Sequence, residues 1–584
     1  DSATQRLIGG SFVFMDGGTC HLKGFTAPVE IWRVMSAVPI SSRFDTSHSA
    51  ELNTLVGREP EMGLLHDRLH SAKEGEGQAV LISGEAGIGK SHILSAFNAS
   101  IKDDGYLTVR LQCSQHEINA AFQPILAEIE VASDFQSGDS LEIRQSKLHD
   151  YLGSVFIKQD QAVLLIAALM SLSDNKYAPL DMSPQRIKRS TIATFVERIS
   201  LLSRQKPLVM VIEDVHWIDP SSLEVLDALV EKVQSLPVLM VMTHRPEFST
   251  QWGSYGHITT HSLNRLGRSD GRAISEQVTG GKPLPDEVLN RILQQTDGIP
   301  LFVEELTKTV LEAGILTEHE DCYVLDGPLP EIAIPMTLHD SLMARLDRMS
   351  RVKRVIQAAA CIGREFKSSL LASALSMRTD ELESALHRLL EAQLIFRIGT
   401  ATDGTYIFKH ALVQDTAYAS LLIKSRKTLH QLIAQTLEQT ENPNPLELAR
   451  HYSSSGAYDR AASLYLTVGR QSLESSALPE AIGALELGLQ ASEAIVPSKQ
   501  HDRIELDIRV VLGIARMANF GWAHPSVSEA LVPAFPLAKD FADTDALGPI
   551  LWGLWVHYQT RAEFPHAHDW LSELKSVADA HRQS

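Results

Sequence analysis

Residues 84–91 have the amino-acid types and the spacing of a loop that wraps around phosphate groups. They read GEAGIGKS and match the pattern G-x-x-x-x-G-K-[S/T] at each fixed position. The glycines let successive N–H groups turn toward phosphate oxygens, Lys90 adds a positive charge for the β- and γ-phosphates, and the Ser91 hydroxyl can bind Mg²⁺. The predicted nucleotide-binding residues of this loop are Gly84, Gly87, Gly89, Lys90 and Ser91. A glycine-rich loop without a ligand is the alternative interpretation.

Two carboxylates end an apolar run that comes later in the chain. Residues 208–214 read LVMVIED, which places Glu213 and Asp214 together at the end of a strand. A phosphate loop that works on ATP needs an acid for the metal ion and a group that positions water. We therefore expect Glu213, with Ser91, to hold Mg²⁺ and Asp214 to polarise the attacking water. The alternative is that the two acids only end the strand.

Short apolar strands that alternate with helices must position these groups. The expected strands are Ala79–Ser83, Tyr106–Leu111, Leu208–Ile212 and Val238–Met242. Each is almost continuously apolar, as in a parallel strand covered on both faces, so the predicted fold is an α/β P-loop NTPase with a parallel sheet. The last strand leads into Thr243, His244 and Arg245, which we expect to sense the γ-phosphate, although polar residues after a strand are also ordinary loop chemistry.

Helical periodicity replaces this alternation after about residue 280. The expected helices are Leu342–Met349, Val352–Cys361 and Thr379–Ala392, and the expected strands are Leu394–Ile398 and Thr405–Phe408. Three helices closed by a hairpin are the pattern of a winged helix. From about residue 445 the pattern is that of helical hairpins with small residues at the crossings. Residues 456–461 and 477–481 resemble one another as helix starts, which indicates a degenerate helical repeat.

Composition limits the class of protein. A chain of 584 residues is too long for one core, so several domains are expected. The 53 Lys+Arg and 72 Asp+Glu give a net charge of −19, which makes nucleic acid an unlikely partner. No apolar run is long enough for a membrane span. The four cysteines are far apart and form no CxxC pair, which favours a reducing cytoplasm over disulfides or a zinc site.

Four segments resemble motifs of the STAND-type signal-transduction ATPases. They are VIEDVHWIDP at 211–220, LVGRE at 55–59, GIPLFVEEL at 298–306 and FKHALV at 408–413, and with the phosphate loop they follow the order of the family. The resemblance implies that Gly57 and Arg58 contact the nucleotide base and that Pro300 packs near the adenine. It also implies that His410 touches the β-phosphate and holds a resting state.

The sequence departs from the STAND pattern at two positions. The family usually begins its acidic pair with Asp, whereas this chain has Glu213, so the resemblance implies ATP binding more strongly than fast hydrolysis. Ala411 replaces the Asp that follows the family histidine, which weakens the inference about His410. A structural role for this histidine is the alternative.

The N-terminal segment resembles the closing strands of a class III nucleotide cyclase domain. The matching residues read LKGF at 22–25 and PVEIWRV at 28–34, and Lys23 matches the lysine that approaches the ATP phosphates. The metal-binding aspartates and the Asn/Arg pair of such cyclases are expected upstream of Asp1, so the chain is expected to begin partway through a longer one. An unrelated β-hairpin is the alternative.

These observations predict six regions and a function. The regions are a cyclase remnant at 1–36, a linker at 37–51, a P-loop ATPase at 52–280, a helical extension with the GxP motif at 281–345, a winged helix at 346–440 and TPR-like repeats at 441–584. We expect a cytoplasmic module that binds ATP/ADP with Mg²⁺ and regulates a class III adenylate or guanylate cyclase. The alternatives are a STAND-class transcriptional regulator and a scaffold that never turns its nucleotide over. The expected partners are the chain's own upstream cyclase domain and a protein bound by the repeats, and self-association is left open.

Overall fold

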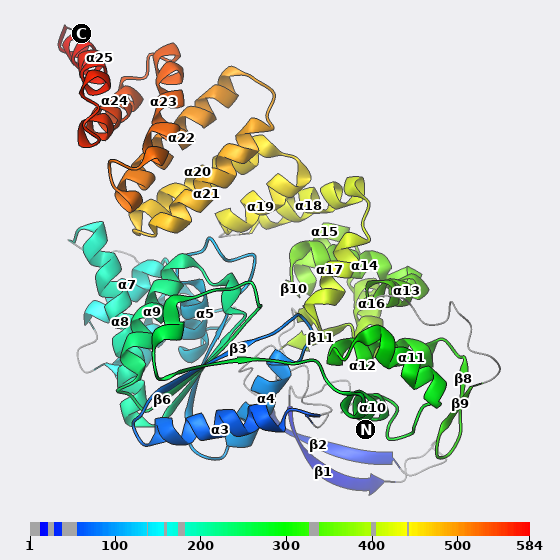
Figure 1. Cartoon of the computed structure of the whole chain (residues 1–584). Coiled ribbons are helices and arrows are strands. Elements are labelled where there is room, and N and C mark those ends of the chain that lie inside the picture. The colour runs from blue at the N-terminus through cyan, green and yellow to red at the C-terminus, as the bar shows by residue number, and fades with distance from the viewer. Residues whose placement is uncertain are drawn as a thin grey trace. The chain divides into compact units, whose positions relative to one another are not determined.

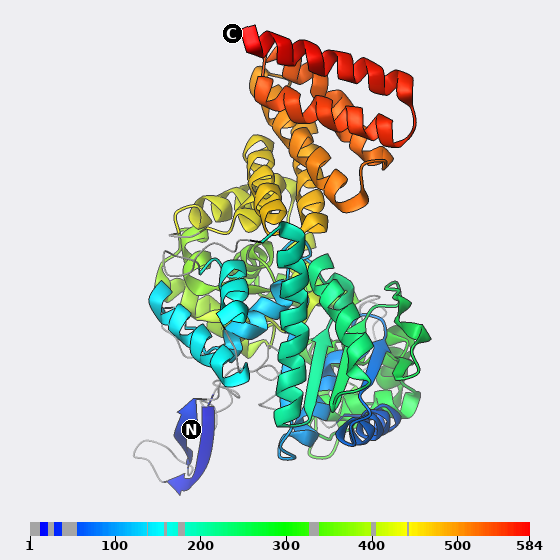
Figure 2. The same ribbon diagram turned by 90° about the vertical axis from the view of Figure 1, so that its left-hand side faces the viewer.

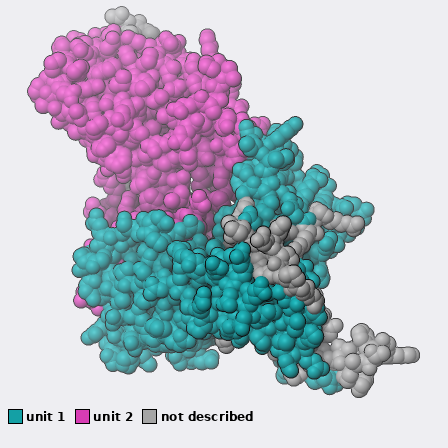
Figure 3. All heavy atoms as spheres, turned by 45° about the vertical axis from the view of Figure 1, so that its right-hand side comes forward, with its two compact units in different colours: residues 1–110, 206–213, 237–436 teal, residues 111–205, 214–236, 437–584 magenta. Residues whose placement is uncertain are grey.

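The computed structural model gives the chain as two compact units (Figure 3). The first contains residues 1–110, 206–213 and 237–436, and the second contains residues 111–205, 214–236 and 437–584. The structure describes residues 12–20, 29–37, 55–136, 138–156, 160–172, 182–325, 338–398, 404–440 and 443–583. Within these residues, no helix combines the length and the apolar character needed to cross a membrane.

A five-stranded sheet carries the phosphate loop (Figure 1). Its strands, in spatial order, are β4 (Leu107–Gln112), β5 (Leu208–Glu213), β6 (Val238–His244), β3 (Gln78–Ser83) and β7 (Ile258–Ser262). The pairings of β3 with β6 and β7, and of β5 with β6, are parallel, which confirms the predicted parallel sheet. The sequence prediction missed β7, because its residues ITTHS are mostly polar and form a partly exposed edge strand.

The core of the first unit explains the apolar pattern of these strands. Helices α3 (Glu59–Lys73) and α4 (Lys90–Ile101) contribute Leu65, Leu69, Ile93, Leu94 and Phe97 to one buried cluster. Alternate residues of three strands complete the cluster, because successive side chains of a strand point to opposite faces. They are Val80 and Ile82, Val209 and Val211, and Leu239 and Val241. The apolar face of each helix is therefore fixed against the strands that carry the candidate site.

A helical subdomain follows the sheet in the first unit. It contains α10 (Arg268–Val278), α11 (Asp286–Thr296), α12 (Pro300–Glu312) and a small hairpin of β8 (Leu316–Glu318) and β9 (Tyr323–Leu325). Buried Val288, Ile292, Val303 and Val310 hold α11 and α12 together. Proline is well placed at the first position of α12, because the amide hydrogen that it lacks would have no partner within the helix.

The winged-helix region contains more elements than the sequence indicated. Its helices are α13 (Leu338–Arg348), α14 (Ser350–Ile362), α15 (Ser368–Leu375), α16 (Thr379–Glu391), α17 (Ala411–Ala419) and α18 (Ile423–Leu437). An antiparallel sheet has the order β10 (Glu365–Lys367), β12 (Thr405–Phe408), β11 (Ile395–Ile398). The predicted hairpin and the helices near 342–349, 352–361 and 379–392 are present. Strand β10 and helix α15 were missed because they are too short to show a periodic pattern.

The C-terminal part of the second unit is a TPR-like α-solenoid in which consecutive helices pack as antiparallel neighbours (Figures 1 and 2). The helices are α19 (Pro445–Ser455), α20 (Tyr458–Glu474), α21 (Leu478–Glu493), α22 (Lys499–Phe520), α23 (Pro525–Asp540), α24 (Thr544–Thr560) and α25 (Phe564–Gln583). Small residues do lie at the crossings. A Cβ at Gly469 would be 2.5 Å from Leu485 Cγ, and one at Gly513 would be 2.3 Å from Leu531 Cδ2.

The remaining described helices of the second unit come before and after β5 in the sequence. They are α5 (Gln123–Ala132), α6 (Leu141–Val155), α7 (Asp160–Leu169), α8 (Pro184–Gln205), the short 3₁₀ helix η2 (Val215–Trp217) and α9 (Pro220–Val233). Near the N-terminus, β1 (Phe12–Cys20) and β2 (Val29–Ala37) form an antiparallel pair, longer than the expected runs 11–15 and 29–34. Lys23 and almost all of the predicted linker lie outside the described residues.

Candidate nucleotide-binding site

The phosphate loop joins the buried end of β3 to the first turn of α4. Gly87 and Gly89 have left-handed φ values of 80° and 103°, a conformation that side chains with a Cβ disfavour. Ile88 is 1% exposed and anchors the loop in the core beneath it. Lys90 is the first residue of α4, and its Nζ donates to Gly84 O at 2.7 Å and to Glu85 O at 2.9 Å. The lysine therefore bends back across the loop, where phosphate oxygens could compete for its ammonium group.

The loop is open at one of its glycines, and the binding of a triphosphate to it stays a prediction. A Cβ at Gly89 would meet no atom within 4 Å, so the backbone there is open to a ligand. The N-terminus of α4 follows at once, and the N-terminal end of a helix favours an anion. Ser91 lies in this first helical turn and is partly exposed. Lys90 and Ser91 would hold the phosphates and Mg²⁺, respectively.

Arg58 supports the loop from below. Its side chain donates to Ile88 O at 3.1 Å and to Asn264 O at 2.9 Å, and it pairs with Glu61 at 3.1 Å. Arg58 is only 4% exposed, so these contacts fix the loop against the residues that follow β7. The neighbouring Gly57 has a left-handed φ of 64°. The structure thus places both residues beside the phosphate loop, and contact with the nucleotide base stays a prediction.

The GxP segment also lies against the phosphate loop. Leu301 N donates to Gly87 O at 3.3 Å, which joins the first turn of α12 to the loop. Gly298 has a left-handed φ of 72°, and a Cβ there would be 2.4 Å from Leu266 O, so a glycine is required. Pro300 is therefore brought close to the loop, although 209 residues separate it from Ser91.

Glu213 makes an ion pair that the sequence analysis did not predict. Arg110, on β4, donates to Glu213 Oε1 from Nη2 at 2.8 Å and from Nε at 3.0 Å. Glu213 is 5% exposed, and a buried carboxylate is costly unless it is paired. The signal was available in the sequence, because Arg110 is the only charged residue in the run 106–111 and needs a partner inside the sheet.

The other strand-end residues gather at the same edge of the sheet. Ser83 lies opposite His244, and Gly84 N donates to His244 O at 3.2 Å, so the end of β6 adjoins the phosphate loop. Thr243, at the end of this strand, is 1% exposed. The charge of Arg245 lowers the pKa of Asp415 on α17, although burial has the larger effect and raises that pKa overall.

Asp214 begins a different piece of chain from Glu213. It has a left-handed φ of 55° and precedes η2. Asp tolerates this conformation better than most residues. The sharp bend at Asp214 ends β5 and separates the backbone directions of the two acids. The predicted action of Asp214 on water therefore stays a prediction.

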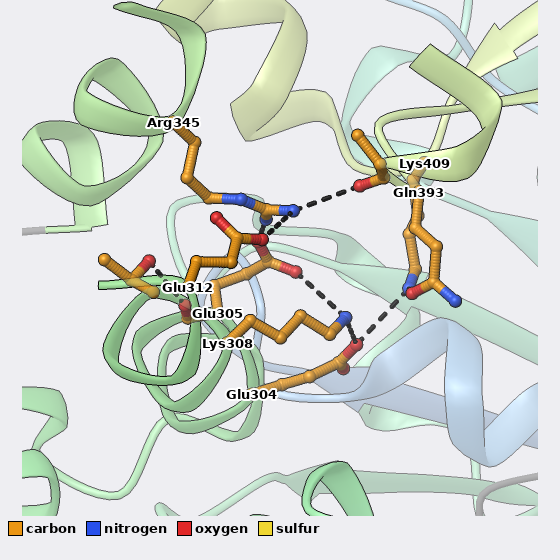
Figure 4. A network of polar contacts seen from close by, with 9 residues as sticks. Glu304, Glu305, Lys308, Glu312, Arg345, Gln393 and Lys409 are labelled. Atoms are coloured by element: carbon orange, nitrogen blue, oxygen red, sulfur yellow. Dashed lines mark hydrogen bonds and ion pairs between the residues drawn. The ribbon is translucent and has the colours of Figure 1, made fainter. Parts of the chain in front are cut away.

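Buried charges connect α12 to α13 and to the winged helix (Figure 4). Glu304 pairs with Lys308 at 2.5 Å and with Lys409 at 3.3 Å, while Glu305 pairs with Lys308 at 3.3 Å and with Arg345 at 2.5 Å. We call these five residues the α12 ion cluster. Arg345 also donates to Ala392 O at 3.0 Å and pairs with Glu312 at 3.1 Å. The ion cluster thus joins α12, α13, the end of α16 and the residue after β12.

The electrostatics of the α12 ion cluster place His410 at its edge. Burial opposes the ionisation of Glu304, but the charges of Lys308, Lys409 and His410 outweigh it and lower the pKa of Glu304 well below its usual range. Burial and the charge of Lys308 lower the pKa of Lys409, and Glu304 opposes this effect. His410 occupies the N-cap position of α17. His410 directly follows Lys409, which pairs with Glu304, and the contact of His410 with a β-phosphate stays a prediction.

The sequence analysis quoted residues 298–306 and 408–413 but did not predict their mutual contact. A weak signal exists in α12, whose residues LFVEELTKTVLE place two acids and a lysine within one turn on a mostly buried helix. Their partners, however, lie up to 105 residues away. Only the folded chain shows which cations they meet.

Comparison with known proteins agrees with this geometry. Residues 54–241 match the family model of the AAA ATPase domain. An uncharacterized protein of Rhizobium meliloti (strain 1021) is 25% identical over 589 residues, which cover 98% of this chain and 56% of that protein. The peroxide stress-activated histidine kinase mak3 of Schizosaccharomyces pombe is 24% identical over 327 residues, which cover 50% of this chain and 13% of that protein.

The chain therefore spans about half the length of the first relative and much less of the second. Among solved structures, a signal transduction ATPase with numerous domains (STAND) and a tetratricopeptide repeat sensor, from Pyrococcus horikoshii, has 12% identity and a TM-score of 0.44. The match covers 91% of this chain and 72% of that chain. Residues 54–241 of this chain contain an AAA-type ATPase domain.

Proposed function

We propose that this chain is a nucleotide-dependent regulatory switch that binds MgATP at residues 84–91 and transmits the state of the nucleotide to the winged helix. The observation that carries the proposal is the placement of α12. Its first turn bonds to Gly87 of the phosphate loop through Leu301 N, and its next turn carries Glu304, which pairs with Lys409 beside the winged helix. A change in the loop can therefore act on the winged helix through one rigid element.

We assign each role from the residue type and its place at the sheet edge. Lys90 would stabilise the β- and γ-phosphates, and Ser91 and Glu213 would hold Mg²⁺, which would neutralise phosphate charge. Asp214 polarises the attacking water. Arg110 engages one of the two carboxylate oxygens of Glu213, so we propose that hydrolysis is slow and requires this pair to loosen.

The finer proposal is that the regulated partner is a class III cyclase domain that lies upstream in the same polypeptide. The support is the resemblance of residues 22–34 to such a domain and the antiparallel pairing of β1 with β2. Two strands cannot form the metal site of such a cyclase, which uses paired aspartates to activate a ribose hydroxyl. We therefore expect this chain to turn over ATP only to ADP.

Replacing Glu213 with glutamine should slow ATP hydrolysis by about tenfold or more, because a neutral amide is a poorer partner for Mg²⁺ and its water. ATP affinity should change by less than about threefold, because the phosphate loop is intact. The measurement follows labelled ATP and its products by thin-layer chromatography in Mg²⁺ and in Mn²⁺. Glu247→Gln, on the exposed loop after β6, is the matched control.

The same chromatograms test the finer proposal. ADP as the only product supports it, and cyclic AMP from this chain would contradict the placement of cyclase chemistry upstream. A parent chain that forms no ADP would show that the nucleotide is a structural ligand.

Replacing His410 with aspartate should speed the release of bound ADP by about tenfold, equivalent to ~1.4 kcal/mol. The added carboxylate would repel Glu304 in the α12 ion cluster and the predicted β-phosphate. Stopped-flow displacement of a fluorescent ADP analogue gives the rate. His387→Asp, on the exposed face of α16, should leave it unchanged. Equal release rates in the parent and His410→Asp would leave His410 with a structural role only.

A further inference from the structure

A glutamate of the helical repeats lies at the N-terminus of α9, the helix that follows the segment after β5. Glu480, in the first turn of α21, is 0% exposed, and its Oε1 accepts a hydrogen bond from Ser221 N at 2.8 Å. Ser221 is the second residue of α9, and its N–H group is one of those that a helix cannot satisfy internally. A residue 259 positions away in the sequence therefore performs a capping role.

The usual cap of α9 is also present, so the helix has two acids at one end. Asp219 is the N-cap residue, and its Oδ1 accepts from Ser222 N and from Phe122 N, each at 2.8 Å. Asp219 is 1% exposed. The second oxygens of both acids, Asp219 Oδ2 and Glu480 Oε2, are buried and have no hydrogen-bond partner among the described residues. Two buried carboxylates at one helix end repel each other, so a proton on Asp219 would lower the cost of burying the pair.

The environment of Asp219 favours its protonated form. Burial raises the pKa of Asp219 to about 7, with a smaller contribution from the charge of Glu480, although hydrogen bonds from Ser222 and Phe122 oppose the shift. One turn later, the backbone of α21 also lies close to the side chain of Asn119. A Cβ at Gly483 would lie 2.7 Å from Asn119 Oδ1, so a larger residue would require Asn119 to move.

We propose that Glu480 is an intramolecular latch, in which the first turn of α21 caps α9 beside Asp219 and fastens the repeats to the helix that follows the two strand-end acids. A ligand of the repeats that moves α21 would uncap α9. Because α9 begins seven residues after Glu213, this latch gives the repeats a route to the site of the proposed function. The latch itself requires no bound nucleotide.

The test is hydrogen–deuterium exchange of the whole 584-residue chain. In Glu480→Ala, the amides of residues 221–223 and of the first turn of α21 should exchange at least about fivefold faster, the size expected for a lost cap. In Glu480→Gln, they should exchange at the parental rate, because the amide keeps an acceptor for Ser221 N and offers a donor to Asp219. Glu493→Ala, an exposed position at the end of α21, is the matched control.

Three outcomes would overturn the latch. They are unchanged exchange in Glu480→Ala, an equal acceleration of all amides of the chain, and acceleration in Glu480→Gln as large as in Glu480→Ala. ATP affinity, measured in parallel, keeps this test separate from the proposed function. Loss of ATP binding in the parent chain would contradict the proposed function and leave the latch standing.

Discussion

Lys90→Ala is expected to weaken ATP binding by at least about tenfold, or ~1.4 kcal/mol. Lys90 Nζ now bonds to Gly84 O and Glu85 O, so the ammonium group is already held over the loop. A bound triphosphate would replace these neutral acceptors with charged oxygens, and charge-assisted hydrogen bonds are stronger. Alanine has no ammonium group, so the variant cannot form these stronger bonds to the phosphate oxygens. Titration with a fluorescent ATP analogue in the presence of Mg²⁺ measures the loss.

The control for this prediction lies at the other end of the same helix. Lys102 follows α4 and is exposed, so Lys102→Ala removes an equal charge without touching the loop. Circular dichroism should show that both variants keep the parental helix content. Equal ATP affinities in the parent and a folded Lys90→Ala variant would show that residues 84–91 do not bind the nucleotide.

Arg345→Met is expected to destabilise the first unit by about 3–5 kcal/mol, because breaking a buried ion pair leaves an uncompensated charge. Arg345 is 5% exposed, and its partner Glu305 is 3% exposed. Lys308 lies 3.3 Å from Glu305 and will offset part of the loss, which favours the lower end of this range. Urea unfolding followed by limited proteolysis of the first unit gives the change in free energy.

A double variant separates lost charge from lost packing. In Glu305→Gln with Arg345→Met the stranded carboxylate is gone, so stability should recover by more than about half of the loss. Arg354→Met, on the exposed face of α14, should cost less than about 0.5 kcal/mol. If Arg345→Met unfolds at the same urea concentration as Arg354→Met, the α12 ion cluster contributes little to stability.

The parallel sheet and the phosphate loop could be predicted from the sequence because their signals are local. Residues 84–91 carry their whole pattern within one loop, and four of the five strands are mostly apolar runs. Strand β7 escaped because an edge strand with one face in solvent can be polar. Strand β10, with only three residues, is held by its partner β12 rather than by its own sequence.

The contacts around the candidate site could be predicted only in part. Motif order indicated that the segments containing Arg58, Pro300 and His410 gather near the nucleotide, and the structure brings the first two to the loop. It could not indicate that Arg110 pairs with Glu213, because 103 residues separate them and no local pattern selects the partner. Buried ion pairs depend on which helix faces which strand. That information exists only once the chain is packed.

The length of α12 sets the order in which its contacts would break if the helix moved. The helix has 13 residues, and its bond to Gly87 lies at its first turn. The helix would therefore pivot about this end. At a rise of 1.5 Å per residue, a tilt of ~5° about Leu301 would displace Glu304 by ~0.4 Å but Glu312 by ~1.4 Å. The Arg345–Glu312 pair would therefore part first, while Glu304 still held Lys409. Small movements of the loop would therefore leave the Glu304–Lys409 pair intact, and only large ones would break the contact with the winged helix.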